Sequence, residues 1–246
     1  MTDRPSLVIS DVHWGAIPAE RERAFLAFLR SWRGSAREIF FNGDLFDFWF
    51  EYRTVVPAQA FPLLRVLAEL TESGVRLALL GGNHDAWGGA FLREAIGVEV
   101  LEGPARREIA GWRVWLAHGD GLGQGDLGYR ALKAVLRSRA AIGAFRWLHP
   151  DWAARLARAV SKTGRAGESE RKRLEERAAA LHAFARDLLS RDRSIDVVVL
   201  GHCHVPTLVE EEPGRYYVNA GDWVAHRSYA VLRPGHVEMK TAVDSR

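Results

Sequence analysis

Residue types that bind metal ions follow the ends of five short apolar segments of this chain. Asp11 and His13 come after Leu7–Ser10, and Asp44 comes after Glu38–Phe41. The remaining clusters are Gly82-Asn83-His84-Asp85 after Arg76–Leu80, His118-Gly119-Asp120 after Trp112–Ala117, and Gly201-His202-Cys203-His204 after Val197–Leu200. Each cluster alone is more typical of an ordinary turn. Because open α/β sheets place their sites beyond the carboxyl ends of strands, the five together predict one shared site.

The ligand types indicate two metal ions rather than one. Carboxylate, imidazole and amide donors suit Mn, Fe or Zn, and a single cysteine, Cys203, argues against a thiolate zinc site. Cys203 itself is more simply a small buried thiol. Seven or eight candidate ligands are too many for one such ion. Two cations that share a carboxylate can support in-line attack on phosphorus, so the pattern predicts a hydrolase of phosphate esters or anhydrides.

The segments between these clusters alternate in the manner of an α/β fold. Amphipathic helices are expected at about Glu20–Arg33 and Ala58–Ser73, because apolar residues recur there with helical spacing. Strands separated by helices of this length favour βαβ units and a largely parallel sheet. After Val197 the strand candidates follow one another more closely, which favours a mixed second sheet. The expected strands are the five segments named above and Tyr216–Val218.

Residues 126–190 are expected to be almost continuously helical. Apolar residues recur every four positions from Leu148 to Val160, which predicts a helix over Phe145–Val160. A second apolar stripe predicts a helix over Glu170–Leu189, and we expect that helix to pack against the α/β body. We therefore predict a helical cap, residues 126–193, inserted into a body formed by residues 1–125 and 194–246.

Positive charge is concentrated in the same part of the sequence. The net charge is +3, but residues 129–193 contain sixteen Lys and Arg against seven Asp and Glu, a local charge of +9. The remainder of the chain carries −6. Such a block suggests a polyanionic partner, namely nucleic acid, anionic lipid or phosphate groups, and a solvated Arg-rich helical face explains it equally well.

The composition excludes several classes of protein. With 48% hydrophobic and 26% charged residues, the chain resembles a folded globular protein and not a disordered one. One cysteine permits no internal disulfide and favours a reducing compartment. The first ten residues lack the pattern of a secretion signal, and no apolar run approaches the length of a membrane span. A cytoplasmic location is therefore expected.

Taken together, the five clusters resemble the signature of the calcineurin-like metallophosphoesterases. The matching blocks are Asp11-x-His13, Gly43-Asp44-x-x-Asp47, Gly82-Asn83-His84-Asp85, His118 and Gly201-His202-x-His204. The resemblance covers the whole body and implies a four-layer αββα sandwich with a dinuclear metal centre. The implied ligands of one ion are Asp11, His13, Asp44 and His204, and those of the other are Asp44, Asn83, His118 and His202.

A narrower resemblance concerns the substrate. Gly43-Asp44-Leu45-Phe46-Asp47-Phe48-Trp49, and His118-Gly119-Asp120 followed by Asp126 and Tyr129, are similar to the UDP-2,3-diacylglucosamine pyrophosphohydrolases of lipid A synthesis. These enzymes insert a helical lid at this point, which holds acyl chains. The resemblance implies cleavage of the pyrophosphate bond of UDP-2,3-diacylglucosamine to UMP and 2,3-diacylglucosamine 1-phosphate (lipid X). It also implies two divalent ions, Mn²⁺ before Fe or Zn, and a peripheral place at the cytoplasmic face of the inner membrane, with no nucleic acid as partner.

The same resemblance implies roles for individual residues. Asp44 and His84 would take part in catalysis, the histidine by acting on the leaving group or a phosphate oxygen. The best-known members have arginine where this chain has His84, and the stretch beyond Lys162 departs from their pattern. The implied substrate contacts are Asn83, His84, Asp126, Tyr129, Ser161, Lys162, Arg165 and His202.

Two other functions remain open at this point. The chain could hydrolyse another phosphodiester, nucleotide or phosphoprotein, and turnover would then need neither acyl chains nor detergent. It could also be a non-catalytic adaptor that keeps the fold and binds a membrane or nucleic acid through its cap. The complete ligand set favours an enzyme, and the apolar, basic cap favours a lipid-linked substrate. Trp147 and Trp152 are the candidates for contact with a membrane interface.

Overall fold

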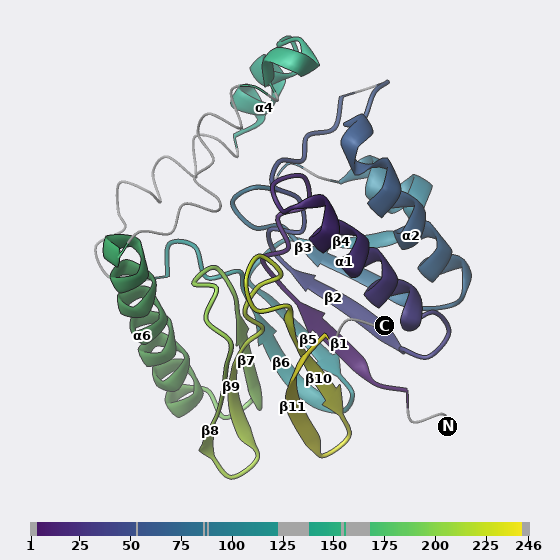
Figure 1. Cartoon of the computed structure of the whole chain (residues 1–246). Coiled ribbons are helices and arrows are strands. Elements are labelled where there is room, and N and C mark those ends of the chain that lie inside the picture. Colours follow the sequence, from purple (N-terminus) through teal and green to yellow (C-terminus); the bar gives the residue numbers. More distant parts are fainter. Residues whose placement is uncertain are drawn as a thin grey trace.

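The chain folds around two β-sheets that face each other (Figure 1). The computed structural model describes residues 4–52, 54–85, 87, 89–122, 138–153, 155 and 168–242. Strands β11-β10-β1-β2-β3-β4 form a six-stranded sheet in that order, and β5-β6-β7-β9-β8 form a five-stranded sheet.

The six-stranded sheet has a parallel half and an antiparallel edge. Its parallel strands are β1 (Ser6–Ile9), β2 (Glu38–Asn42), β3 (Arg76–Leu80) and β4 (Val98–Leu101). The connections between them contain α1 (Ala19–Ser31), the short η1 (Ala58–Ala60), α2 (Phe61–Glu72) and the π-helical η2 (Leu92–Ile96). The hairpin of β10 (Ser228–Arg233) and β11 (His236–Thr241) pairs antiparallel with β1. The predicted βαβ units and parallel sheet are confirmed.

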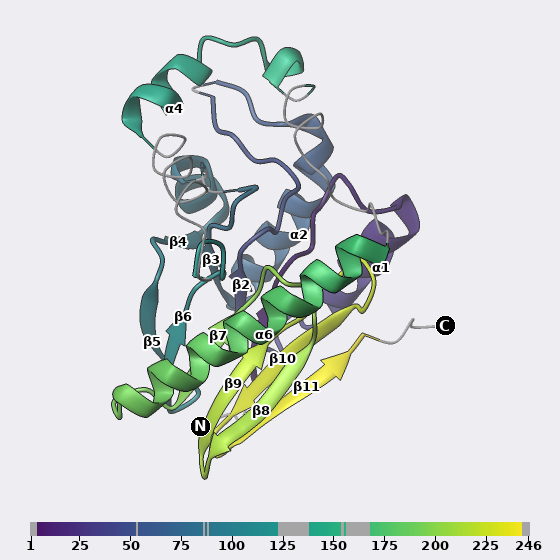
Figure 2. The same ribbon diagram turned by 90° about the vertical axis from the view of Figure 1, so that its left-hand side faces the viewer.

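The five-stranded sheet is mixed. Its parallel centre is β6 (Trp112–Leu116), β7 (Val197–Leu200) and β9 (Arg215–Asn219), and its antiparallel edges are β5 (Ala105–Ile109) and β8 (Thr207–Glu212). Helix α6 (Glu168–Arg191) runs across the outer face of this sheet (Figure 2). Leu181, Ala185 and Leu189 of α6 are buried together with residues of β7 and β9, so this helix packs against the body.

Side chains that alternate along each strand build the layers. Leu7 and Ile9 of β1 belong to the core beneath α1 and α2, whereas Val8 belongs to the core between the two sheets. Phe41 and Phe40 of β2 divide in the same way. Because both faces are covered, β1, β2 and β7 are buried along their whole length. The order helix, sheet, sheet, helix confirms the expected four-layer αββα sandwich.

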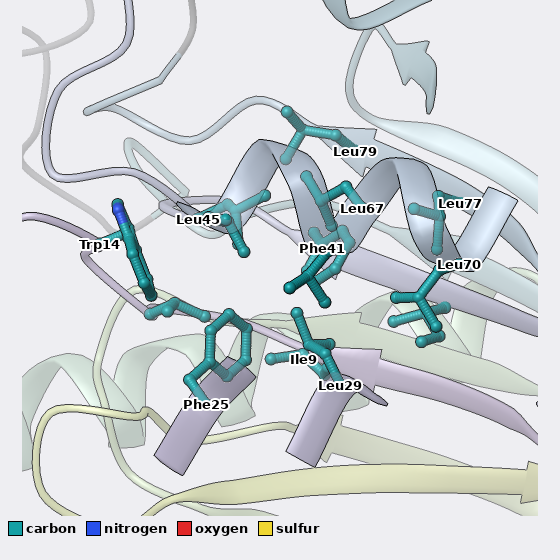
Figure 3. Packing of buried hydrophobic residues seen from close by; sticks show 14 of the residues in the cluster. Ile9, Trp14, Phe25, Leu29, Phe41, Leu45, Leu67, Leu70, Leu77 and Leu79 are labelled. Atoms are coloured by element: carbon teal, nitrogen blue, oxygen red, sulfur yellow. The ribbon is translucent and has the colours of Figure 1, made fainter. Parts of the chain in front are cut away.

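The core beneath α1 and α2 fixes these helices on the six-stranded sheet (Figure 3). Phe25 and Leu29 of α1, Leu67 of α2, Ile9 of β1 and Phe41 of β2 belong to one cluster and are essentially inaccessible to solvent. Close packing of this kind leaves the strands little freedom to shift. The loops that follow β1 and β2 therefore leave the sheet at defined positions along one edge.

Two of the strands missing from the sequence-based prediction, β5 and β8, have compositions that hide them. β5 reads Ala-Arg-Arg-Glu-Ile and β8 ends in three glutamates, because both are edge strands with solvent-facing side chains. β10 pairs with β1 across most of the chain, with Leu232 opposite Ser6. Such a distant pairing leaves no local signal, so the return of the C-terminal hairpin to the first sheet was not predictable.

The prediction of a helix over Phe145–Val160 is wrong for its first residues, because one helix ends at Phe145 and the next begins at Pro150. Helix α4 spans Arg139–Phe145, and the hydroxyl of its N-cap residue Ser138 accepts a hydrogen bond from the Ala141 amide. The chain then turns, and helical structure resumes only at Pro150. Proline disfavours a helical conformation in the residue before it, which explains the break. Residues 126–137, 154 and 156–167 of the predicted cap lie outside the described residues.

Within the part of the chain that the structure describes, no helix combines the length and the apolar composition needed to cross a membrane.

Replacing Leu29 with alanine should destabilise the body without changing the chemistry of the site. The side chain is fully buried in the core beneath α1 and α2, and the cavity left by its removal should lower the free energy of unfolding by about 2–5 kcal/mol. Denaturant titration measures the loss. The control is Arg23→Ala at an exposed position of the same helix, and a loss as large in that variant would contradict the assignment of the core.

Candidate metal centre

The predicted clusters come together where the two sheets meet at their carboxyl ends. The amide of His202, after β7, donates to the Asp11 carboxylate, after β1, over 3.0 Å. The side-chain amide of Asn42 at the end of β2 donates to the Ala117 carbonyl after β6, also over 3.0 Å. Each bond joins one sheet to the other. Loops from both sheets therefore form a single crevice.

Three groups of side chains in this crevice are arranged so that each could hold a metal ion. Within each group, one ligand atom per residue lies within 4.8 Å of the others. The groups are Asp11 with His13 and His204, His13 with Asp44 and His84, and Asp44 with His118 and His202. The first group matches one ligand set implied by the sequence except that it lacks Asp44. The third group matches the other set except that it lacks Asn83. Asn83 itself is exposed.

Asp44 is an ionised carboxylate at the centre of this arrangement. Burial alone would raise its pKa, but the imidazole of His118, with smaller contributions from His13 and His84, holds the pKa well below its usual range. Its Oδ2 lies 3.1 Å from His118 Nε2 and 3.9 Å from His13 Nε2. Burial alone would likewise lower the pKa of His118, but the carboxylates of Asp44 and Asp11 raise it well above its usual value. The crevice thus favours positive charge next to Asp44.

Several nitrogen atoms in the crevice are buried without a hydrogen-bond partner among the described residues. They are both ring nitrogens of His13 and Nε2 of His118. Leaving such atoms unsatisfied costs about 1–3 kcal/mol each. The Nδ1 atom of His118 lies 3.0 Å from the Asn42 carbonyl, which can only accept, so Nδ1 carries a hydrogen. In the neutral ring the lone pair is therefore on Nε2, where a metal ion would replace the proton that faces Asp44. Divalent cations would bind the lone pairs of His118 Nε2 and of one ring nitrogen of His13, and the residues therefore fit the metal ions that the sequence implies.

The backbone is strained at the residues that carry these side chains. Asp11, His13, Asp44, His202 and His204 all have φ between 51° and 69°, in the left-handed region. Residues other than glycine rarely adopt this conformation, and each instance costs on the order of 1–3 kcal/mol. Strain at five ligand candidates indicates that the fold enforces their orientation.

Glycines next to the clusters make room for the ligand side chains. A Cβ atom on Gly82 would lie 2.1 Å from Asp44 Oδ1, and one on Gly43 would lie 2.2 Å from His118 Nδ1. A Cβ on Gly201 would lie 2.8 Å from Asp11 Oδ2. These glycines therefore let the backbone approach the ligand side chains closely.

Asp85, a residue without a role in the sequence analysis, holds two of the loops together. Its carboxylate accepts hydrogen bonds from the amides of Leu45 over 2.7 Å and Gly82 over 2.8 Å, and longer ones from Asp44 and Phe46. Burial, followed by the charge of Asp44, raises the pKa of Asp85 to about 6. The amides of Gly82 and Phe46 and the charge of His118 oppose this rise in the pKa. Asp85 therefore fixes the loop after β2 against the loop after β3.

Asp222 is a second functional residue that the sequence analysis missed. Its carboxylate lies 3.1 Å from His204 Nδ1 and accepts hydrogen bonds from the amides of Ala225 and His226. Burial alone would raise the pKa of Asp222, but the bond to His204 holds it at about 2. A carboxylate behind a histidine orients the ring and leaves Nε2 for a metal. Asp222 follows β9 after a glycine, so the pattern that identified the other clusters also applies to it.

His84 belongs to one of the three candidate groups, with His13 and Asp44, but to neither of the two ligand sets implied by the sequence. Its ring is edge-on to that of His13, with centroids 4.8 Å apart. Its Nδ1 lies 2.8 Å from the Asp47 carbonyl, so Nδ1 donates that bond and Nε2 remains available. Its backbone amide donates to Asp44 Oδ1 over 3.0 Å. The half-buried ring is therefore held at the mouth of the crevice.

Phe145 connects the segment of α4 to aromatic side chains in the loops of the crevice. The ring centroid of Phe145, at the end of α4, is 4.7 Å from that of Phe50, 4.9 Å from that of Trp87 and 5.9 Å from that of Phe48. The predicted substrate contacts Asp126, Tyr129, Ser161, Lys162 and Arg165 lie outside the described residues. Cys203 is a buried thiol whose pKa burial raises to about 11, in agreement with its simpler interpretation.

The chain is similar over most of its length to proteins of one family. The sequence profile described as calcineurin-like phosphoesterase matches residues 4–206. A Porphyromonas gingivalis protein named UDP-2,3-diacylglucosamine hydrolase is 32% identical over 239 residues, which cover 90% of this chain and 91% of the relative. An Ectopseudomonas mendocina protein of the same name is 33% identical and covers 88% of this chain and 89% of its own length.

Similarity to solved structures is weaker. A Vps29 variant from Entamoeba histolytica is 15% identical, with 96% of this chain and 97% of the other covered at a TM-score of 0.44. A predicted phosphoesterase from Streptococcus pneumoniae is 14% identical, with 98% of both chains covered at a TM-score of 0.42. At these values neither structure bears on function.

The substitution Gly82→Ala should weaken metal binding. The added methyl group would meet both the carboxylate of Asp44 and its backbone nitrogen, 2.6 Å away, so the loop must shift. Mn²⁺ affinity, measured by calorimetric titration, should fall by about tenfold or more. The rise in melting temperature that Mn²⁺ produces should shrink in parallel.

Gly143→Ala is the matched control, since a Cβ atom there meets nothing within 4 Å. Unchanged Mn²⁺ binding in the Gly82 variant would show that Asp44 does not depend on this close approach.

Proposed function

Because the chain belongs to the calcineurin-like phosphoesterase family, we propose that it is a metal-dependent hydrolase that cleaves the pyrophosphate bond of UDP-2,3-diacylglucosamine. The products would be UMP and 2,3-diacylglucosamine 1-phosphate. The observation that carries the proposal is the buried Asp44 carboxylate, which lies between two groups of candidate ligands. The relatives named UDP-2,3-diacylglucosamine hydrolase, which match the chain along about nine-tenths of its length, support the choice of substrate.

The family implies divalent metal ions, and we assign their ligands to the two sets implied by the sequence, both of which include Asp44. One ion would be held by Asp11, His13, Asp44 and His204, and the other by Asp44, Asn83, His118 and His202. When bound, such ions activate water and neutralise charge on the phosphate during in-line displacement. Mn²⁺ is the first candidate, because carboxylate, imidazole and amide donors suit it and no thiolate is involved.

The side chains around the ions would position and neutralise the phosphate groups. His84 can donate a hydrogen bond from a protonated Nε2 to a phosphate oxygen or to the leaving group, since its Nδ1 is committed to the Asp47 carbonyl. Asp222 and the Asn42 carbonyl keep the rings of His204 and His118 in one orientation. Groups fixed in this way lose little freedom when the substrate binds, which favours catalysis.

The cap would bind the remainder of the substrate. We propose residues 126–193 as a cap over the crevice, with Asp126, Tyr129, Ser161, Lys162 and Arg165 as substrate contacts. The aromatic contact between Phe145 and the loops of the crevice supports this position. An apolar wall so close to a phosphate site suits a substrate that has both acyl chains and a pyrophosphate.

The cap would also place the enzyme at a membrane surface. Trp147 is 91% exposed and Trp152 is 63% exposed, and the Arg155 guanidinium lies 5.6 Å from the Trp152 ring centroid. Exposed tryptophans beside arginines are typical of proteins that bind the interface of anionic membranes. We therefore propose a peripheral association with the cytoplasmic face of the inner membrane.

The purified protein should release UMP from UDP-2,3-diacylglucosamine in the presence of Mn²⁺. The Asp44→Asn variant should lose this activity, because the carboxylate shared by the two ligand groups is neutralised. Chromatography of the nucleotide product measures both reactions, and Asp187→Asn, an exposed position on α6, is the matched control. A protein with two bound metals that releases no UMP would exclude this substrate, and hydrolysis of a soluble diester instead would favour the broader phosphodiesterase function.

Binding to anionic vesicles should depend on the two exposed tryptophans. The double variant Trp147→Ser and Trp152→Ser should bind such vesicles several-fold more weakly, because it loses the apolar rings that enter the interface. Vesicle sedimentation gives the bound fraction. Phe61→Ser, which removes a 64% exposed ring from the body, serves for comparison, and equal losses in both proteins would refute the assignment of the surface to the cap.

A further inference from the structure

The loop that carries Asn83 and His84 is fastened to the preceding loop at both of its ends. At the inner end, the Asp85 carboxylate binds amides of the loop after β2. At the outer end the acceptor comes from the other loop. The Glu51 carboxylate, in the loop after β2, accepts hydrogen bonds from the amides of Gly89, Phe91 and Leu92, the last of which begins η2. His84 lies between these two attachments.

Glu51 accepts four hydrogen bonds. Its Oε1 accepts from the Gly89 amide over 2.7 Å, and its Oε2 accepts from the Phe91 amide over 2.9 Å. Oε1 also accepts from the Leu92 amide and from the indole Nε1 of Trp49. Hydrogen bonds to a charged acceptor contribute more than neutral ones, and a carboxylate before the first amides of a helix is favourably placed. No cation is needed to explain the position of Glu51.

The segment between Asp47 and Glu51 also determines where the His84 ring lies. The Asp47 carbonyl accepts the bond from His84 Nδ1 over 2.8 Å, and the Trp49 amide donates to the His84 carbonyl over 3.3 Å. Trp49 is fully buried, and its indole nitrogen depends on Glu51. A loss of the Glu51 carboxylate would therefore release Trp49, whose amide donates to the His84 carbonyl, and also the segment after His84 that begins at Gly89.

We propose that Glu51 is a positioning residue for the hydrolytic reaction, which acts by holding the loop after β3 so that His84 Nε2 faces the phosphate. The inference rests on the role proposed above for His84. Glu51 does not reach the candidate ligand groups itself, so its removal should leave the metal ions in place and reduce the rate of the chemical step.

The test compares Glu51→Ala and Glu51→Gln with the wild type in the presence of Mn²⁺, using UDP-2,3-diacylglucosamine and the soluble diester bis(p-nitrophenyl) phosphate. Glu51→Ala should lower kcat by about 10- to 100-fold, as expected for a displaced catalytic group, with little change in KM or in bound metal. Glu51→Gln should restore part of the rate, because its oxygen can replace Oε1. Glu20→Ala, at an exposed position on α1, is the matched control.

Combination with His84→Ala separates positioning from general support of the fold. If Glu51 acts through His84, Glu51→Ala should cause no further loss in the His84→Ala background. An equal loss in both backgrounds, or a loss of bound metal in Glu51→Gln, would overturn the proposal.

The imidazole NMR signals of His84 provide a readout that needs no turnover. In protein with ¹⁵N-labelled histidine, the Nδ1–H signal should weaken or shift in Glu51→Ala and stay in place in Glu20→Ala. An unchanged signal would overturn the positioning role. If the wild type hydrolyses neither substrate while Glu51→Ala still moves this signal, the proposed function fails but the structural effect of Glu51 on His84 stands.

Discussion

A carboxylate shielded from water determines how this crevice is built. Asp44 is 1% exposed, and burial penalises its ionised form, yet surrounding imidazoles hold its pKa well below the usual range. Those imidazoles satisfy it incompletely, because His13 and His118 retain buried nitrogens without hydrogen bonds among the described residues. An ionised group in such surroundings requires nearby positive charge. Divalent cations meet that requirement for the carboxylate and also bind one lone pair of each of these imidazoles.

Surrounding one carboxylate with ligands from several loops constrains the backbone. Five candidate ligands adopt left-handed conformations, at a cost on the order of 1–3 kcal/mol each. Local sequence does not provide this energy, so the four packed layers must provide it by fixing the strand ends. Asp85 and the Asn42 side chain then join the loops to one another. The glycines are part of the same constraint, because a methyl group at Gly82 would displace Asp44 itself.

The sequence predicts those parts of the molecule that leave a local pattern. Apolar runs and ligand types that recur at fixed spacing made helices α1 and α2, the clusters at strand ends and six of the strands predictable, namely β1, β2, β3, β6, β7 and β9. β10 and the Asp222–His204 pair depend on contacts between distant segments. Glu51 resembles an ordinary surface glutamate until its amide partners, about forty residues away, are known. Pro150 is the exception, because it marks the break after α4 in the sequence itself.

The uneven charge of the chain follows from the same requirement for cations. Outside residues 129–193 the chain carries −6, and its crevice contains several buried carboxylates. Without cations, the field of these carboxylates would repel a pyrophosphate. Bound divalent ions would reverse the local sign, and the +9 segment would add long-range attraction from the cap. Under the proposed function, the metal ions are therefore needed to admit the substrate as well as to cleave it, and the attraction of the basic segment adds to theirs.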